Sequence, residues 1–254
     1  MKTLAILFAA AALCSSTAIA GDHLDPENSL YEQAVLGVDN WMAMKLDYEQ
    51  MVITELKEAF DEDVKIRVIE LPSFVPESAT GIRDNNGAYR IFFINPEIML
   101  WNYETLKDLK SGRIRIEDGK PNSQERRIAE LQEFLPSDYH SVKIDRCEVD
   151  IDAALALKII RIWKQMLLQT GYDRPANIDD PLPGTFGLDG SNYHFSMQAG
   201  YQVLTGQVWS PGDAKPSVKK FVSIVIAMRQ YCATKGVNAK QLESEVDALS
   251  KRLQ

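Results

Sequence analysis

Two segments with the pattern of β-hairpins constrain the fold of this chain most. Residues 193–198 alternate strictly between apolar and polar side chains, residues 199–200 (Ala-Gly) supply a turn, and residues 201–209 have the composition of a returning strand. Residues 84–87 (Asp-Asn-Asn-Gly) tolerate positive φ, and they precede the aromatic and β-branched run 89–94. Because hairpins join antiparallel neighbours, the sequence predicts an antiparallel sheet or small meander.

Helices are predicted in runs of their own, apart from the strands. A start signal at Asp25-Pro26-Glu27 predicts a long N-terminal helix, in which apolar residues recur every three to four positions up to Ala59. Two segments, 150–169 and 218–232, are too broadly apolar for surface helices and are predicted to lie in a core. Further helices are expected at 97–110, 123–134 (capped by Ser123) and 238–253, and further strands at 64–68, 113–117 and 139–144. The predicted fold class is therefore α+β.

The N-terminus has the features of a cleavable leader. Lys2 precedes an apolar run at residues 4–13, and small residues occupy the positions that a signal peptidase reads, Ala18 and Ala20. We expect a signal peptide at 1–20 and one mature domain at 21–254, located in the periplasm or secreted. The alternative is a division of the mature chain into two lobes, 21–148 and 149–254. No membrane span is expected, because a spanning helix needs about 20 apolar residues.

The cysteines predict a covalent link. Cys14 lies within the leader, which leaves Cys147 and Cys232 as an even pair in an exported chain, the usual setting of a disulfide. Two isolated cysteines and three scattered histidines do not have the spacing of a metal site, so neither a metal nor a cofactor is expected.

The charge of the chain bears on its partners. The chain has 36 acidic and 28 basic residues and a formal net charge of −8. This acidity argues against nucleic acid, whose phosphates attract basic patches. It permits a basic protein partner, which an acidic surface would steer by long-range attraction.

Common catalytic signatures, such as the Gly-x-Ser-x-Gly elbow and His-Glu-x-x-His, are absent from the sequence. The main candidate for a binding surface is the polar face of the hairpin at 191–209. The alternative is an ordinary solvated sheet face. The candidate residues of this face are Asn192, His194, Ser196 and Gln198, joined by Gln207 and Trp209 from the returning strand.

A loop predicted at 171–190 is the second candidate region, because long loops in compact domains often carry function. Its aspartates are Asp173, Asp179, Asp180 and Asp189. Aspartate beside proline and glycine is also ordinary turn chemistry. The acids Glu148, Asp150 and Asp152 are interpreted as the first turn of a helix, where they complement its dipole. His140 stands alone on a predicted strand and receives no role.

These observations favour an exported protein that acts by protein–protein binding, for example as an inhibitor or immunity factor against an envelope-acting toxin or enzyme. Two alternatives remain. One is a cell-envelope hydrolase that uses carboxylates near the 171–190 loop. The other is a small-ligand carrier with a cavity between the two lobes.

Overall fold

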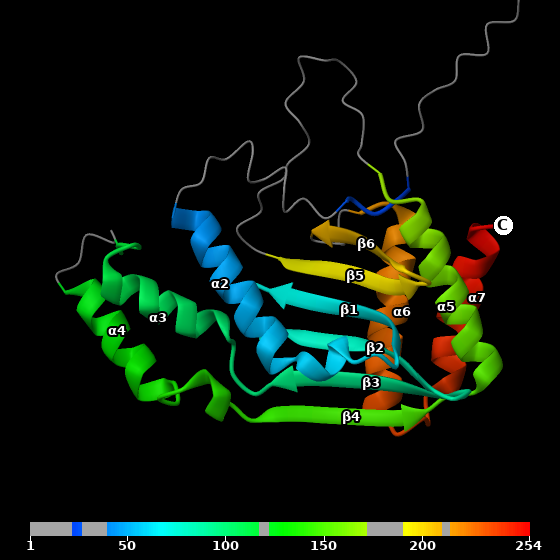
Figure 1. Cartoon of the computed structure of the whole chain (residues 1–254), viewed down its shortest axis with the longest axis horizontal. Coiled ribbons are helices and arrows are strands. Elements are labelled where there is room, and N and C mark those ends of the chain that lie inside the picture. Colours follow the sequence, from blue (N-terminus) through cyan, green and yellow to red (C-terminus); the bar gives the residue numbers. More distant parts are fainter. Residues whose placement is uncertain (1–21, 27–39, 117–121, 172–189, 210–213) are drawn as a thin grey trace, which may run out of the picture.

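A computed structural model describes residues 22–26, 40–116, 122–171, 190–209 and 214–254. Its strands form one antiparallel sheet in the order β4-β3-β2-β1-β5-β6 (Figure 1). The bounds of the strands are β1 Val64–Pro72, β2 Ser78–Asn85, β3 Ala88–Pro96, β4 Ile144–Asp150, β5 Ser191–Ala199 and β6 Gln202–Trp209. The predicted α+β class is confirmed, with both predicted hairpins in place.

Helices pack on both faces of this sheet. In β1, the side chain of Val68 is buried in the core that contains α5, α6 and α7, while the next residue, Ile69, packs with α2 on the opposite face. This alternation is the normal consequence of the β pleat. The bounds of the helices are α2 Asn40–Glu55, η1 Lys57–Phe60, α3 Trp101–Ser111, α4 Ser123–Phe134, η2 Tyr139–Ser141, α5 Ala153–Leu168, α6 Pro216–Ala233 and α7 Ala239–Arg252.

The two broadly apolar segments form the larger core, as predicted. Trp163 of α5 and Phe221 of α6 are fully buried, and their rings meet edge to face at 4.5 Å between centroids. Phe195 of β5 packs against both rings. Among the described residues, no helix combines the length and the apolar character that a membrane crossing requires.

A disulfide joins Cys147 of β4 to Cys232 of α6, as predicted, with a Cα–Cα distance of 5.9 Å. Cys232 is fully buried, so the bond fastens one end of the sheet to the centre of the larger core. The bridge links the two sides of residue 148, the boundary of the alternative division into two lobes.

Residues 22–25 form an N-terminal clasp on the opposite edge of the sheet. The Asp22 carboxylate accepts hydrogen bonds from the main-chain N–H of Ser217 at the start of α6, and Leu24 is fully buried. Asp25 exchanges two main-chain hydrogen bonds with Gln207 of β6. The long helix predicted to start at residues 25–27 is not confirmed, because α2 begins at Asn40 and residues 27–39 lie outside the described residues.

Two predicted strands are wrong. Residues 113–116 form no strand, because the main-chain N–H groups of Arg113 and Ile114 both bond to the carbonyl oxygen of Asp108 and wrap the chain around the end of α3. In the segment 139–144, Tyr139–Ser141 is a short 3₁₀ helix and β4 starts only at Ile144. The Asp138 carboxylate accepts from the N–H of His140 and so favours a helical turn there.

Two predicted helix starts also change. Ser123 is the first residue of α4 rather than its cap, and Asn122 precedes it with a positive φ of 61°. Helix α5 begins at Ala153, where Asp152 is the cap and accepts from the N–H of Leu155. Glu148 and Asp150 therefore belong to strand β4, not to the first turn of a helix.

Candidate functional site

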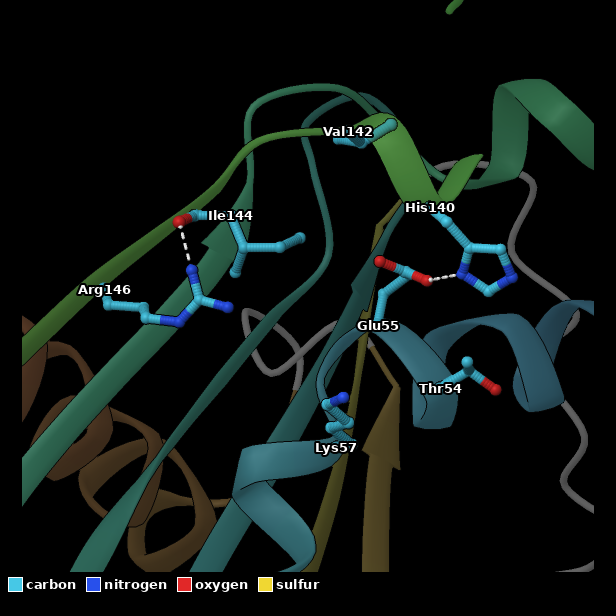
Figure 2. A pocket seen from close by; sticks show the side chains of 7 residues that line it. All are labelled: Thr54, Glu55, Lys57, His140, Val142, Ile144 and Arg146. Atoms are coloured by element: carbon cyan, nitrogen blue, oxygen red, sulfur yellow. Dashed lines mark hydrogen bonds and ion pairs between the residues drawn. The ribbon is translucent and has the colours of Figure 1, made fainter. Parts of the chain in front are cut away.

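An open cleft with a volume of about 450 Å³ lies between the end of α2 and the start of β4 (Figure 2). We call it the α2–β4 cleft. Its walls come from two distant parts of the sequence, α2 with η1 and η2 with β4. It is lined by Thr54, Glu55, Lys57, His140, Val142, Ile144 and Arg146.

Buried polar contacts fix α2 beside the cleft. The fully buried Glu77 accepts a hydrogen bond from the Tyr48 hydroxyl of α2 at 2.7 Å, and others from the N–H groups of Leu100 and Trp101 at the start of α3. Burial, together with the charge of Glu77, raises the pKa of Tyr48 far above its usual range. Tyr48 therefore stays protonated and donates to Glu77, so that α2 and α3 are held together.

A carboxylate–imidazole pair occupies one side of the cleft. Oε1 of Glu55 lies 2.7 Å from Nδ1 of His140, and the ring of His140 packs on that of Tyr139 with 4.1 Å between centroids. The Glu55 side chain is 9% exposed and the His140 side chain 53%. Because Nδ1 is engaged, the second ring nitrogen points away from Glu55 (Figure 2). This orientation leaves the second ring nitrogen of His140 able to form a hydrogen bond to a ligand.

Two cationic side chains line the other side. Arg146 donates through Nε to Glu58 at 2.8 Å and through Nη1 to the carbonyl oxygen of Ile144 at 2.7 Å, so its guanidinium is held in place. Lys57 is exposed, and its ammonium has no partner among the described residues. Lys57 thus supplies an unneutralised positive charge at the cleft.

Apolar side chains contribute to the lining. Val142 is buried and Ile144 is half-buried. The hydroxyl of Thr54 donates to the carbonyl oxygen of Gln50 at 2.7 Å, so it is already engaged within α2. The combination of apolar surface and a cationic side chain fits a carboxylate carried on a short aliphatic chain.

A buried hydroxyl lies behind the pair. The Tyr103 oxygen has no hydrogen-bond partner among the described residues, and its ring meets that of Tyr139 edge to face at 6.1 Å. Burial, then the charges of Asp138 and Glu55, raise the pKa of Tyr103. Tyr103 therefore stays neutral and supports Tyr139, on which the imidazole of His140 rests.

The sequence-predicted hairpin residues share one face of the sheet, but they lie far from this cleft. In the β5–β6 pairing, Asn192 is opposite Trp209 and His194 is opposite Gln207. Ser196, on the same face, is only 8% exposed, whereas Gln198 is exposed and donates to Gly200. Strand β5 is separated from β4 by β1, β2 and β3, a distance of about 19 Å at the usual strand spacing.

The four aspartates proposed for the 171–190 loop, Asp173, Asp179, Asp180 and Asp189, lie outside the described residues. Within the part of the chain that the structure describes, no group of three His, Cys, Asp or Glu side chains is arranged to hold a metal ion.

Sequence reasoning missed the cleft residues. The sequence predicts no role for His140, and no pattern in it distinguishes Glu55, Lys57 or Arg146. The local signal that existed was Asp138, whose position two residues before His140 favours a short turn over a strand. No local pattern indicates that His140 meets Glu55, which lies 85 positions earlier.

Comparison of the chain with models of protein families, with curated proteins and with solved structures found no match. The class that the structure defines is therefore an α+β protein with a disulfide between sheet and helix and a charged surface cleft at one edge of the sheet.

Proposed function

We propose that this protein acts outside the cytoplasm by binding a partner protein, and that the α2–β4 cleft receives an acidic side chain of that partner. The observation that carries the proposal is Lys57, an exposed ammonium without a partner among the described residues, in a cleft where His140 and Arg146 already have theirs. A partner carboxylate would neutralise Lys57 without displacing an existing ion pair.

The long-range and local charges have separate roles in this proposal. The net charge of −8 steers a basic partner toward the protein. Lys57 then sets the position at which one acidic side chain of that partner docks, which contributes specificity more than affinity. An inhibitor or immunity factor against an envelope-acting enzyme is the kind of binding protein that we propose.

We favour binding over hydrolysis because the hydroxyl group in the cleft lining, that of Thr54, is already hydrogen-bonded within its own helix. Glu55 and His140 have the geometry of a general base, which needs a nucleophile or a water to activate. Among the described residues, none of those that line the cleft is a serine or a cysteine.

The experiment is a quantitative capture of partners from the cell envelope with the mature protein tagged at its C-terminus. Lys57→Glu reverses the unpaired charge and is expected to lower recovery of the partner at least about tenfold, as reversal of a charge at a docking contact does. The matched control is Lys164→Glu, an exposed lysine on α5, which packs on the opposite face of the sheet.

If the wild type and Lys57→Glu recover equal amounts of the partner, the cleft is not the docking site. If no specific protein is captured, the proposed binding role is wrong. Circular dichroism of each variant checks that the fold is intact. Trp209→Ala serves as a separate arm: loss of the partner on this substitution alone would move the interface to the β5–β6 face.

A further inference from the structure

Among the described strands, β4 is an outer strand of the sheet and pairs only with β3 (Figure 1). Its hydrogen-bonding pattern follows from two flanking contacts: Ile151 N–H donates to Tyr89, and Glu97 N–H donates to Lys143. Hydrogen-bonded pairs alternate along an antiparallel ladder. The odd-numbered residues of β4 therefore bond to β3, and the even-numbered residues direct their N–H and C=O groups away from the sheet.

Part of this outer edge is already used. The carbonyl oxygen of Ile144 accepts from the Arg146 guanidinium, and that of Asp150 accepts from the Tyr231 hydroxyl at 2.9 Å. The main-chain groups of Arg146 and Glu148 remain without a partner among the described residues. These two residues flank Cys147, whose disulfide fastens the strand to α6.

We propose that this edge pairs with the same edge of a second copy of the chain, antiparallel and about a two-fold axis at Cys147. In this register Arg146 of each copy lies opposite Glu148 of the other. The two copies would exchange main-chain hydrogen bonds at these positions and form one continuous sheet, in an interface that uses the same surface twice.

Charge complementarity selects the second copy as the occupant. A register centred on Arg146 would place two arginines opposite each other, and one centred on Glu148 would place two glutamates opposite each other, both of which are unfavourable. Centring on Cys147 pairs opposite charges at both positions. Charged residues on an edge usually block pairing with other strands. Here the two residues that flank Cys147 have opposite charges, so a two-fold axis at Cys147 places Arg146 of one copy opposite Glu148 of the other.

Both side chains have partners in their own chain but are partly exposed. Arg146 is 52% exposed and Glu148 is 41% exposed. The Glu148 carboxylate forms long ion pairs with Arg83 at 3.9 Å and Arg90 at 4.0 Å, which are beyond hydrogen-bonding distance. Arg146 uses Nε and Nη1 within its own chain, and its Nη2 atom has no partner among the described residues.

The opposite edge is different. The N-terminal clasp occupies part of the outer side of β6 through the bridge between Asp25 and Gln207. A second copy is therefore accommodated better at β4 than at β6. Arg146 lines the α2–β4 cleft as well as this edge, whereas Lys57, the residue that carries the proposed function, lies on η1, so the two proposals can be tested at different residues.

The test is sedimentation velocity of the purified mature protein over a wide range of concentration. The wild type is expected to form a reversible dimer. Arg146→Glu and Glu148→Arg each place like charges opposite one another twice, so each is expected to weaken association at least about tenfold. The double variant Arg146→Glu/Glu148→Arg restores opposite charges and is expected to restore the dimer.

Arg127→Glu on α4, an exposed arginine paired with Glu130, is the matched control and should leave association unchanged. A wild type that stays monomeric throughout would overturn the inference. So would single variants that dimerise normally, or a double variant that stays as weak as the single ones. Because Lys57→Glu leaves β4 unchanged, loss of partner capture in that variant with normal dimerisation separates the two proposals.

Discussion

Nδ1 of His140 lies 2.7 Å from Oε1 of Glu55 across a separation of 85 residues. This contact joins the end of α2 to η2, the short helix just before β4, and forms one wall of the α2–β4 cleft. The carboxylate of the pair is nearly buried and the imidazole is half exposed. The pair therefore links α2 to η2, while the His140 ring stays accessible to solvent.

Replacing His140 with alanine is expected to lower the free energy of unfolding by about 1 kcal/mol, because Glu55 loses the partner of a mostly desolvated carboxylate. Urea denaturation measures this change. The control Arg127→Ala breaks an exposed pair one turn apart on α4 and should cost about 0.3 kcal/mol. Equal effects of the two substitutions would contradict a special role for the buried carboxylate.

Replacing Gly81 of β2 with alanine is expected to destabilise the fold by about 3 kcal/mol or more. A Cβ atom there would lie 2.2 Å from the carbonyl oxygen of Ile66 and 2.7 Å from the ring of Phe92. The strands would have to separate, so the thermal midpoint should fall steeply. Gly171→Ala is the control, since its nearest neighbour would lie at 3.8 Å, an ordinary contact.

The pair formed by Glu70 of β1 and Arg229 of α6 predicts a loss of stability in acid. Burial alone would raise the pKa of Glu70, but the charge of Arg229 and hydrogen bonds from Tyr193 and Ser191 outweigh it, so the pKa is lowered. A carboxylate with a lowered pKa in the folded state stabilises the fold above its unfolded pKa of about 4.3. That stabilisation is lost as the pH falls through the folded pKa.

Measurements of unfolding free energy against pH check this. The wild type should lose stability below about pH 4, and Glu70→Gln should show a flatter profile in that range together with lower stability at pH 7. An unchanged slope in Glu70→Gln would show that other carboxylates govern acid unfolding.

The double substitution Cys147→Ser/Cys232→Ser is expected to lower the free energy of unfolding by about 4 kcal/mol, because the bond closes a long loop in the unfolded chain. Reduction of the wild type with dithiothreitol should move its denaturation midpoint toward that of the double variant. If the oxidised and reduced wild type unfold at the same denaturant concentration, the bond does not contribute as proposed.

Local patterns predicted much of the fold. Alternation at 193–198 placed Tyr193, Phe195 and Met197 on the core side, and all three are buried there. The turn at 84–87 could be predicted because asparagine and glycine tolerate positive φ. Asn86 and Gly87 both adopt it. Hairpins close between neighbours in sequence, so their signals lie within a few residues.

The cleft could not be predicted in the same way. Glu55 ends a helix, Lys57 begins the short helix η1 and Arg146 lies on an edge strand, and nothing in the neighbouring sequence distinguishes any of them from other charged residues. Only the placement of β4 at the edge of the sheet brings these side chains together. Strand order depends on the summed packing of all the elements, which no short window of sequence contains.

The N-terminal clasp joins residues from opposite ends of the described sequence. The Asp22 carboxylate lies 3.3 Å from the guanidinium of Arg252, a contact that spans 230 positions and involves the last helix. If Asp22 crosses a membrane before the rest of the chain, this contact cannot form until Arg252, at the end of α7, has crossed as well. Under the export that we propose, the chain would cross the membrane with Asp22 and Arg252 still apart, and this contact would form on the far side.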